Sequence, residues 1–537
     1  MTLVDNLHDL GQGLRFAAAV PGLLRLQVDL DQPRAELRRR FEARGANFLT
    51  LLREGVYAQE SSPYHQLLSW AGCEYGDVER LVETEGLEGP LQALFQAGVY
   101  LTFEELRGTV PARRGSHSVP VRLERLINPR VARGLVVQRA ARNRITGFNL
   151  DRASFRENVL RRAVYEEIWG SSRSARASWA EMGSIGLSGQ IRNVVLGIPS
   201  ERQFTTVDPA SSRLPRRYRW AARWLRWCGL LLGKTLPSPE YVPPDHPEPI
   251  LRWVEQTLRA GRPPVLHTHP SSAVRLAGAA AAAGIRLDGL RFSLYGEPLT
   301  PGRARALRDL GATASANYSS HESGNLGRGC LNAFETDEVH LLTDTQAVIQ
   351  PGDRGPDLGL RPNTLLISSL DLNQPFLLVN ASIGDEAVLT SRDCGCPFEE
   401  AGWTTHLHTI RSFEKLTTGG MTFIDSDVVR VLEEALPARF GGGPLSYQLV
   451  EDELEDGQAA LRLLVDPALG PLDEGQIIEA FLDGIEAPST TAALMGEQWR
   501  EAGFVRVERR APVAAQTGKI AHLLAKGHAP ADTPAPD

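Results

Sequence analysis

The sequence predicts an α/β protein, with a large N-terminal body of mixed sheets and helices followed by a small α+β C-terminal lid domain. Three observations support this prediction. The 537 residues exceed what one hydrophobic core normally serves, so at least two domains are expected. From residue 135 onward, short β-rich runs alternate with helical patterns, which is typical of α/β domains. After Ser412, the order helix, strand, strand, helix, strand indicates a separate compact unit.

The individual elements follow from the spacing of apolar residues. Between residues 37 and 105 these recur every three or four positions, which predicts a helical start to the body. In the rest of the body we predict helices at 152–169, 249–261 and 271–284, and strands at 135–138, 193–198, 264–269 and 290–296. In the C-terminal unit we predict helices at 427–436 and 474–485, and strands at 445–450, 459–466 and 504–508. The predicted boundaries are 1–410 for the body, 411–526 for the lid and 527–537 for a disordered tail.

Composition limits the classes of partner. With 58 basic and 65 acidic residues, the chain has no electrostatic footprint for nucleic acid or an anionic membrane. Its start lacks the pattern of a signal peptide, and its longest apolar stretches are too short to span a bilayer. Five cysteines are too few and too unevenly placed for a disulfide framework. We therefore expect a cytoplasmic protein that acts on small molecules, and a homodimer is compatible with the sequence.

Polar segments follow neighbouring predicted strands. The strand at 290–296 leads into YGEP at 295–298, and one helix and one strand later comes the loop YSSHE at 318–322. Paired strand ends of this kind build ligand crevices in open α/β sheets. His267 and His269, at the end of the strand at 264–269, face the same expected crevice. We interpret them as walls of the pocket in preference to metal ligands.

These segments resemble the phenylacetate-CoA ligase branch of the adenylate-forming superfamily, which has a G-[AG]-E-P turn and then an aromatic-G-x-[ST]-E loop. The resemblance implies that Tyr318 stacks near an adenine and that Glu322 holds Mg²⁺ on the phosphates of ATP. Ser319 replaces the usual glycine, and His321 the usual hydroxyl residue. His321 and Glu322 are therefore candidate catalytic residues. The candidate nucleotide-binding residues of these segments are Gly296, Glu297, Pro298 and Tyr318.

Two later segments extend the resemblance. LLVNASIGDEAVL at 377–389 resembles the family's R-Y-x-[TI]-G-D-x-G segment, which places Asp385 where a carboxylate accepts hydrogen bonds from both ribose hydroxyls. IRSFEKLTTGGMTF at 410–423 resembles the junction between body and lid, and it adds Arg411 to the nucleotide-binding candidates. The junction keeps Arg411, Ser412 and Gly420 and has Glu414 at an acidic hinge position, while Gly419 and Thr422 replace the family's arginine and asparagine.

Near the end, AQTGK at 515–519 resembles the family's late Gly-Lys loop. The resemblance implies that the ammonium of Lys519 bridges the carboxylate and the α-phosphate during adenylation. A compact, mobile point charge can follow the charge that develops on the acyl-phosphate. Lys519 is therefore the third candidate catalytic residue, and the resemblance as a whole covers residues 60 to 526.

The phosphate loop is where the chain departs most from this family. It should follow the strand at 135–138, but the segment 138–147 has no glycine before Gly147, and glycines let backbone N–H groups approach phosphates closely. Arg139, Arg142 and Arg144 could bind phosphate bidentately instead. The alternative is that these arginines form a solvated face and that ATP use has been lost.

Cysteine and histidine residues late in the body predict a metal site. Cys330, His340, Cys394 and Cys396 supply four ligands, the number that a closed tetrahedral zinc site requires. The phenylacetate-CoA ligase branch has Cys and His at similar positions. We interpret the four residues as a structural Zn²⁺ site, with reduced thiols as the alternative. His406 and His408 are further candidate ligands.

Taken together, the resemblance implies a ligase that activates a carboxylic acid, aromatic acids included, as an acyl-adenylate with ATP and Mg²⁺. The acyl group would then pass to the thiol of CoA or of an acyl carrier protein. The alternative from a different class is a non-adenylating homologue that acts as a binding protein or as a transferase of already activated acyl groups. A fatty-acyl protein synthetase is less favoured because no cysteine follows Cys396.

Overall fold

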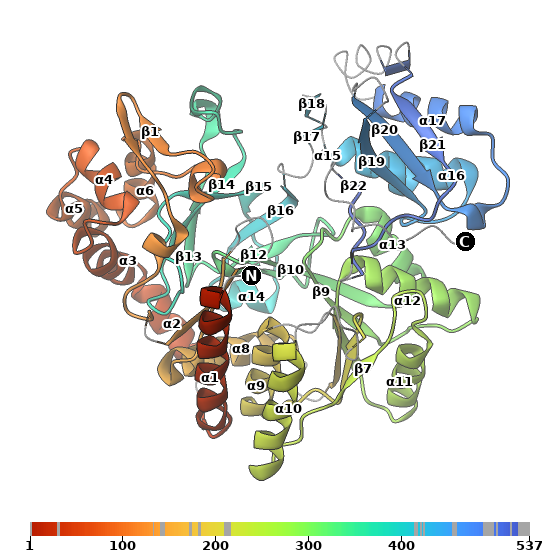
Figure 1. The fold of residues 1–537 in the computed structure, drawn as a ribbon, viewed down its shortest axis with the longest axis horizontal. Coiled ribbons are helices and arrows are strands. Elements are labelled where there is room, and N and C mark those ends of the chain that lie inside the picture. Colours follow the sequence, from red (N-terminus) through yellow and green to blue (C-terminus); the bar gives the residue numbers. More distant parts are fainter. Residues whose placement is uncertain are drawn as a thin grey trace.

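The computed structural model confirms the predicted α/β architecture, with a large body and a smaller C-terminal unit (Figure 1). It describes residues 3–28, 33–132, 134–139, 145–170, 174–180, 184–208, 216–412, 417–418, 421–422, 425–453, 459–486, 499–500, 503–515 and 518–524.

In the described part of the chain, twelve strands form one sheet that crosses the body. Strands β5 to β10 are parallel, and β10 to β16 pair antiparallel. The order is β13-β14-β15-β16-β12-β11-β10-β9-β8-β5-β6-β7. The strands are β5 (Ala175–Trp179), β6 (Arg202–Thr205), β7 (Pro239–Tyr241), β8 (Pro264–Thr268), β9 (Arg291–Tyr295), β10 (Thr313–Ser320), β11 (Gly324–Gly329), β12 (Val339–Leu341), β13 (Gln346–Ile349), β14 (Thr364–Ser369), β15 (Ala381–Ser391) and β16 (Thr405–Ser412).

Helices open the body, as predicted, and flank its sheet. Their starts carry recognisable caps: Asp151 accepts a hydrogen bond from the backbone of Ser154, and Thr300 precedes a proline at the first helical position. The opening helices are α1 (Leu3–Leu24), α2 (Pro33–Glu42), α3 (Arg44–Leu52), α4 (Pro63–Trp70), α5 (Tyr75–Glu85), α6 (Glu88–Gln96) and α7 (Phe103–Leu106). The later ones are α8 (Arg152–Ile168), α9 (Ser184–Val195), α10 (Arg216–Leu231), α11 (Glu248–Arg259), α12 (Pro270–Ala282), α13 (Pro301–Asp309) and α14 (Pro397–Glu400).

The two faces of the parallel half of the sheet differ in polarity. Helices α11, α12 and α13 pack on an apolar face that includes Leu266 and Phe292. Helices α8 and α9 lie on the opposite face, where Glu166 of α8 pairs with Arg176 of β5 and Gln190 of α9 bonds Gln203 of β6. One face is therefore an ordinary core, and the other is built from polar contacts.

The strand predicted at 193–198 is wrong, because this segment contains the end of helix α9. Leu187, Ile191 and Val194 recur at helical spacing and pack with α1 and α10. A short apolar run such as NVVLGI does not distinguish a strand from the last turn of a buried helix. The strands of this region are β5 and β6, which the sequence pattern did not reveal.

The C-terminal unit is a four-stranded sheet with helices, in which β19, β20 and β21 match the three predicted strands and β22 was not predicted. Its core contains Leu432, Leu449, Leu461 and Phe481. In Figure 1 this unit (blue) lies beside α12 and α13 (green). Its elements are α15 (Asp425–Arg430), a π-helical turn (Val431–Ala435), α16 (Leu436–Phe440), β19 (Tyr447–Glu453), β20 (Ala459–Val465), α17 (Glu474–Glu486), β21 (Val505–Glu508) and β22 (Leu523–Leu524).

Three further pairs of short strands form two-stranded antiparallel sheets. They are β1 (Ala112–Arg114) with β2 (His117–Val119), β3 (Leu135–Arg139) with β4 (Ile145–Asn149), and β17 (Thr417–Thr418) with β18 (Met421–Thr422). Across the described ranges, the helices are too short or too polar to cross a membrane.

Candidate active site

The late Gly-Lys loop lies against the turn that follows β9. The Nζ atom of Lys519 is 2.8 Å from the position that a Cβ atom would take on Gly296. Gly296 has a φ of +78°, so both its backbone and the approach of the lysine require glycine. Hydrogen bonds between Ala515 and Lys519 and between Gly518 and Ala515, each 2.8 Å long, close the lysine loop. Lys519 thus reaches the carboxyl end of a parallel strand, where open α/β sheets bind ligands.

The body holds both neighbours of Lys519 in place. Glu297 accepts a hydrogen bond from the backbone N–H of Ile520 at 3.0 Å and from that of Ser271 at 2.9 Å. Arg275 donates to the carbonyl of Gly518 at 3.1 Å. Glu297, which the sequence suggested as a nucleotide-binding residue, therefore fixes the lysine loop, and Pro298 continues the same turn.

Arg303 of α13 connects this loop to the C-terminal unit. Its Nε atom donates to Glu433 at 2.9 Å, its Nη2 atom donates to the carbonyl of Ile520 at 3.1 Å, and its Nη1 atom is 3.7 Å from Glu297. Glu433 also bonds His522 at 2.6 Å. Burial alone would raise the pKa of Glu433, but Arg303 and His522 outweigh it and hold the pKa below its usual value. Sequence reasoning missed Arg303 because the partners of a buried charge become visible only in the fold.

We predict that Glu433→Gln weakens the docking of the C-terminal unit. Arg303 and Glu433 are each only 1% exposed, and breaking a buried pair from one side costs about 3–5 kcal/mol. The free energy of unfolding, measured by denaturant titration, should fall accordingly. Glu434→Gln is the control, because its ion pair with Arg305 lies at the surface and should contribute less than about 1 kcal/mol. Similar losses in both variants would contradict the prediction.

Tyr318 and Asp385 meet although they come from different strands. The hydroxyl of Tyr318 donates to the Oδ2 atom of Asp385 at 2.8 Å. Tyr318 follows Asn317, which pairs with Tyr295, so its backbone lies at the strand end next to Gly296, and its side chain reaches Asp385 on β15. Burial raises the pKa of Tyr318 well above its usual value, and the charges of Asp385 and Glu322 add to the effect, so the hydroxyl stays a donor. An aromatic ring beside a carboxylate suits a nucleoside, whose base stacks and whose diol donates.

His321 and Glu322 lie in the turn between β10 and β11. The predicted loop is shorter than expected, because β10 extends through Ser320 and only 321–323 form the turn. Ser320 closes it by accepting a hydrogen bond from the backbone of Ser323 at 2.9 Å. Glu322 is half-buried, and no residue in the described ranges forms a hydrogen bond or ion pair with its carboxylate. Its oxygens are of the kind that Mg²⁺ prefers.

The remaining nucleotide-binding candidates differ in what the structure shows of them. Arg411 donates to Asp337 at 2.8 Å. Asp337 also accepts hydrogen bonds from the backbone N–H groups of Thr409 and Ile410, so it fixes the end of β16. The sequence did not indicate this role of Asp337. Arg139 ends β3, which pairs antiparallel with β4, and most of the expected phosphate loop lies between these strands, outside the described residues. Arg142, Arg144, Glu414, Gly419 and Gly420 lie outside the described residues.

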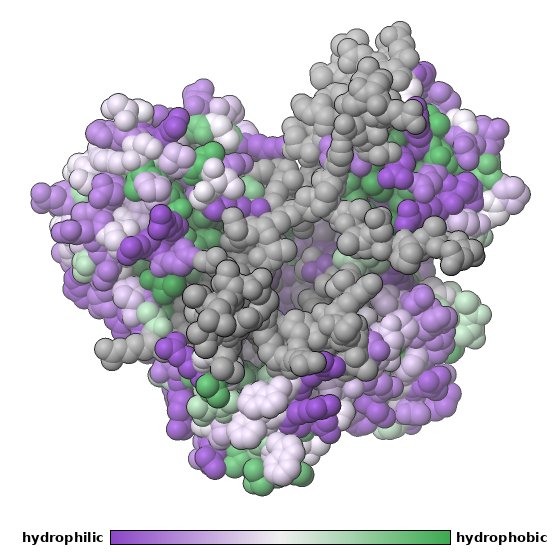
Figure 2. All heavy atoms as spheres, in the orientation of Figure 1, coloured by the Kyte–Doolittle hydropathy of each residue, from purple (hydrophilic) through white to green (hydrophobic). Residues whose placement is uncertain are grey.

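Figure 2 shows that polar side chains gather in a hollow between the C-terminal unit and the body. Of the residues named above, Gly296 and Tyr318 belong to the body, and Lys519 belongs to the chain that returns from the C-terminal unit. The structure therefore brings a lysine, an aromatic ring and carboxylates from four separate segments toward the ends of β9 and β10.

A second cluster lies between β12, β16 and α14. The ligand atoms of Cys330, His340, Cys394 and His406 all lie within 4.8 Å of one another. The Sγ atom of Cys396, the fourth predicted ligand, is 3.1 Å from the Nε2 atom of His340. A hydrogen bond from Cys330, helped by His340, lowers the pKa of the Cys396 thiol against the opposing effect of burial, which favours the thiolate that zinc binds.

The surroundings of this cluster fit a metal. The Nδ1 atom of His340 lies 2.6 Å from the carbonyl of Trp403, an arrangement that leaves Nε2 as a ligand atom. Both ring nitrogens of His406 are buried without a hydrogen-bond partner, so its imidazole is also available to a ligand. His408, in contrast, lies beside the hydroxyl of Thr409 at 3.1 Å. The structure thus adds His406 to the predicted four.

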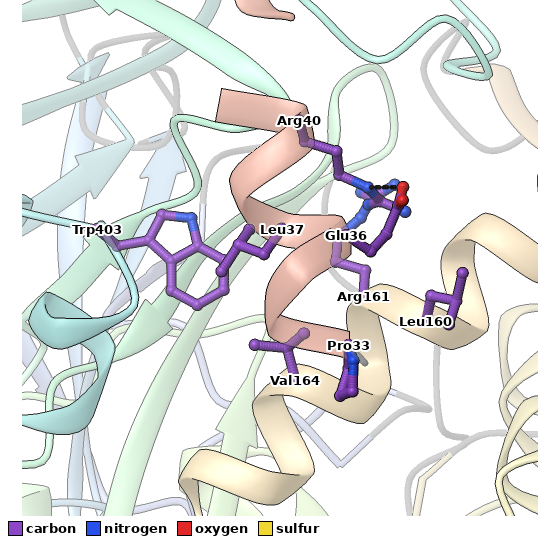
Figure 3. Close-up of a pocket in the computed structure, with 8 residues that line it drawn as sticks. All are labelled: Pro33, Glu36, Leu37, Arg40, Leu160, Arg161, Val164 and Trp403. Carbon is purple, nitrogen blue, oxygen red and sulfur yellow. Dashed lines mark hydrogen bonds and ion pairs between the residues drawn. The ribbon is translucent and has the colours of Figure 1, made fainter. Parts of the chain in front are cut away.

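Trp403 also ties the metal cluster to the opening helices. Figure 3 shows its ring next to Leu37 of α2 and Val164 of α8, in a small depression that also contains the ion pair between Arg40 and Glu36. The ring packs edge-on or tilted against three other aromatic rings. This depression lies where α2 and α8 pack against Trp403. The nearby Cys/His cluster joins segments that are far apart in the chain.

No protein-family model and no curated protein matches the sequence. Solved structures with a similar arrangement include the amide bond synthetase McbA from Marinactinospora thermotolerans, with 15% identity, a TM-score of 0.38 and coverage of 84% of this chain and 90% of that one. The anthranilate CoA ligase AuaEII in complex with anthranoyl-AMP has 11% identity, a TM-score of 0.39 and coverage of 72% and 65%. A variant of E. coli MenE with bound OSB-AMS has 11% identity, a TM-score of 0.35 and coverage of 78% and 69%. At these TM-scores the likenesses say nothing of the chemistry, which has to follow from the side chains.

Proposed function

We propose that this protein is an adenylate-forming ligase. In the first half-reaction, a carboxylate oxygen of the acid attacks the α-phosphorus of ATP and pyrophosphate leaves, giving an acyl-adenylate. In the second, a thiol of CoA or an acyl carrier protein attacks the acyl carbonyl and AMP leaves. The observation that carries the proposal is the docking of Lys519 on Gly296, because it brings a cation to the end of β9, next to the end of β10 that carries Tyr318, the partner of Asp385.

Each residue of the site has a task in this scheme. Tyr318 would stack on the adenine and Asp385 would accept hydrogen bonds from the ribose hydroxyls, while Glu322 would hold the Mg²⁺ that accompanies the phosphates. Lys519 neutralises charge on the carboxylate and the α-phosphate as they approach. Rotation of the C-terminal unit about the segment after Ser412 would exchange the lysine for a surface that admits the thiol. This rotation requires the contacts of Arg303 with Glu433 and Ile520 to open.

We also propose that Cys330, His340, Cys394 and Cys396 hold a structural Zn²⁺, with His406 at its edge. The proposal is supported by the closeness of the five ligand atoms and by the buried ring nitrogens of His406, which lack a hydrogen bond. Zinc here would join β12 and β16 to the loop before α14. It would have no part in the acyl transfer.

Calorimetric titration with ATP and Mg²⁺ tests the proposed function. The parent protein should bind ATP, and Asp385→Ala should weaken the binding by about 1.5–3 kcal/mol, the scale of lost hydrogen bonds to a charged group. Tyr318→Phe is the matched comparison: it removes the hydroxyl that bonds Asp385 but keeps the ring, so it should cost less. If the parent binds no ATP, the non-adenylating alternative takes the place of the ligase.

A further inference from the structure

The polar face of the sheet continues away from the site. His267, Ser293 and Ser315 lie opposite one another on β8, β9 and β10, and the row extends to Ser178 of β5 and Gln203 of β6. Parallel sheets with helices on both faces normally carry apolar side chains on both. The opposite face of this sheet follows that rule. A polar row across five strands is therefore not explained by folding alone.

A chain of hydrogen bonds runs along this row. The Nη1 atom of Arg328 on β11 donates to the side-chain oxygen of Asn317 at 2.6 Å, and the amide of Asn317 donates to the hydroxyl of Ser293 at 3.0 Å. That hydroxyl is 3.2 Å from the Nδ1 atom of His267. The ring of His267 stacks on Tyr295, with 4.3 Å between the centroids, directly before Gly296. The network thus connects the partly buried guanidinium of Arg328 with the place where Lys519 docks.

Three arginines lie close enough to His267 of this row to act on its charge: Arg162 of α8, Arg192 of α9 and Arg328, which we call the arginine cluster. Arg162 pairs with Glu166 at 2.6 Å, whereas Arg328 bonds neutral groups and faces an aromatic ring. The Nε atom of Arg192 is buried without a hydrogen-bond partner, and no ion pair engages this arginine anywhere in the described ranges. Among the described residues, the cluster therefore carries more positive charge than its neighbours neutralise.

The excess charge has a cost that an anion would remove. Burial and the nearby Arg162 lower the pKa of Arg192 to about 10 and that of Arg328 to about 9. Burial and the same arginines hold the pKa of His267 well below its usual value, so this histidine is neutral. A buried cation without a counter-ion destabilises a protein. A bound anion with bidentate acceptor oxygens would satisfy these guanidinium groups.

We propose that the arginine cluster binds an anionic group at the far end of the acid, so that the substrate carries a second negative charge besides the reacting carboxylate. This inference rests on the proposed function. Lys519 marks the reacting end at Gly296, and Ser293 lies three residues earlier on β9, which is about 10 Å along an extended strand. An acid of that length lies along the polar face with one end near Lys519 and the other at the arginines.

Acid-dependent pyrophosphate exchange with matched pairs of acids tests this inference. The probes are dicarboxylic acids from succinate to sebacate, terephthalate, 4-sulfobenzoate and 4-phosphonobenzoate, each paired with its monomethyl ester or with the corresponding monocarboxylic acid that lacks the second anionic group. The parent should prefer the best dianion over its pair by about ten- to hundredfold in kcat/KM, the scale of a charged hydrogen-bond pair. The carboxylate, sulfonate and phosphonate arms identify the anion.

The variant Arg192→Gln should lose most of this preference for dianionic acids. It should use the acids without a second anionic group as the parent does. Its melting temperature should equal or exceed that of the parent, because it removes an uncompensated buried charge; a purely structural arginine would lower it. Arg291→Gln is the control. Arg291 lies on the same face at the opposite end of β9, where it donates to the carbonyl of Trp169 at 2.9 Å, so its loss should leave the preference intact.

The outcomes separate this inference from the proposed function. If the parent uses acids with and without the second anionic group equally well, the inference is wrong, but the proposed ligase function is unaffected. Loss of ATP affinity in Arg192→Gln assigns the cluster to the nucleotide's phosphates and also overturns it. If no acid supports exchange, the ligase falls, but calorimetric binding of a dianion that Arg192→Gln abolishes would still support the anion site.

Discussion

Lys519→Ala is expected to abolish acid-dependent pyrophosphate exchange while ATP affinity changes by no more than a few-fold. The ammonium lies at the strand ends, held there by contacts to both neighbouring residues. Removing one preorganised group that stabilises developing charge lowers kcat by about 10²- to 10³-fold. The ground-state nucleotide is held mainly by Tyr318 and Asp385 in the proposed scheme, so its binding should persist. Both kcat and kcat/KM should therefore fall together.

Two variants make this test specific. Lys234→Ala removes a lysine of the loop after α10 and should leave exchange unchanged. Lys519→Arg keeps the charge but replaces a compact ammonium with a larger planar group next to Gly296, so it should restore only part of the activity. Full exchange activity in Lys519→Ala would remove this lysine from the reaction and leave its docking as a structural contact.

The fold was predictable where the local pattern was strong. Helices α8, α11 and α12, strands β8 and β9 and most elements of the C-terminal unit follow from apolar periodicity and turn residues. The strand predicted at 193–198 was wrong because a short run with β-branched residues has no periodicity that distinguishes a strand from a helix. The antiparallel half of the sheet, β11 to β16, could not be predicted because its strands are held by pairing partners far away in the sequence.

In the candidate site, too, some residues could be predicted from sequence motifs and others only from the tertiary structure. Motif order pointed to Tyr318, Asp385 and Lys519, and the structure places each beside a partner from a distant segment. Arg303 and Asp337 belong to no recognisable motif. An isolated Arg or Asp is usually a surface residue, so nothing in the sequence was a reason to select them. Their importance comes from burial and from partners that only the tertiary structure supplies. The arginine cluster was missed for the same reason, because its members come from α8, α9 and β11.

Cys396→Ser is expected to release zinc and to lower the melting temperature by several degrees. The purified parent should contain about one zinc ion per chain, since a closed site takes four protein ligands. Structural zinc contributes on the order of 10 kcal/mol to the folding of small domains, and here the cluster joins β12, β16 and α14 beneath Trp403. Metal analysis and thermal unfolding measure the two effects.

The control for this experiment is His408→Ala. His408 lies two residues from His406 on β16 but contacts Thr409 instead of the cluster, so this variant should keep both its zinc and its melting temperature. Exposure to a chelator should bring the parent down to the melting temperature of Cys396→Ser and leave that variant unchanged, because the metal is then the whole difference between them. If metal analysis finds no metal in parent protein that was never exposed to a chelator, these residues instead form a cluster of reduced thiols and histidines.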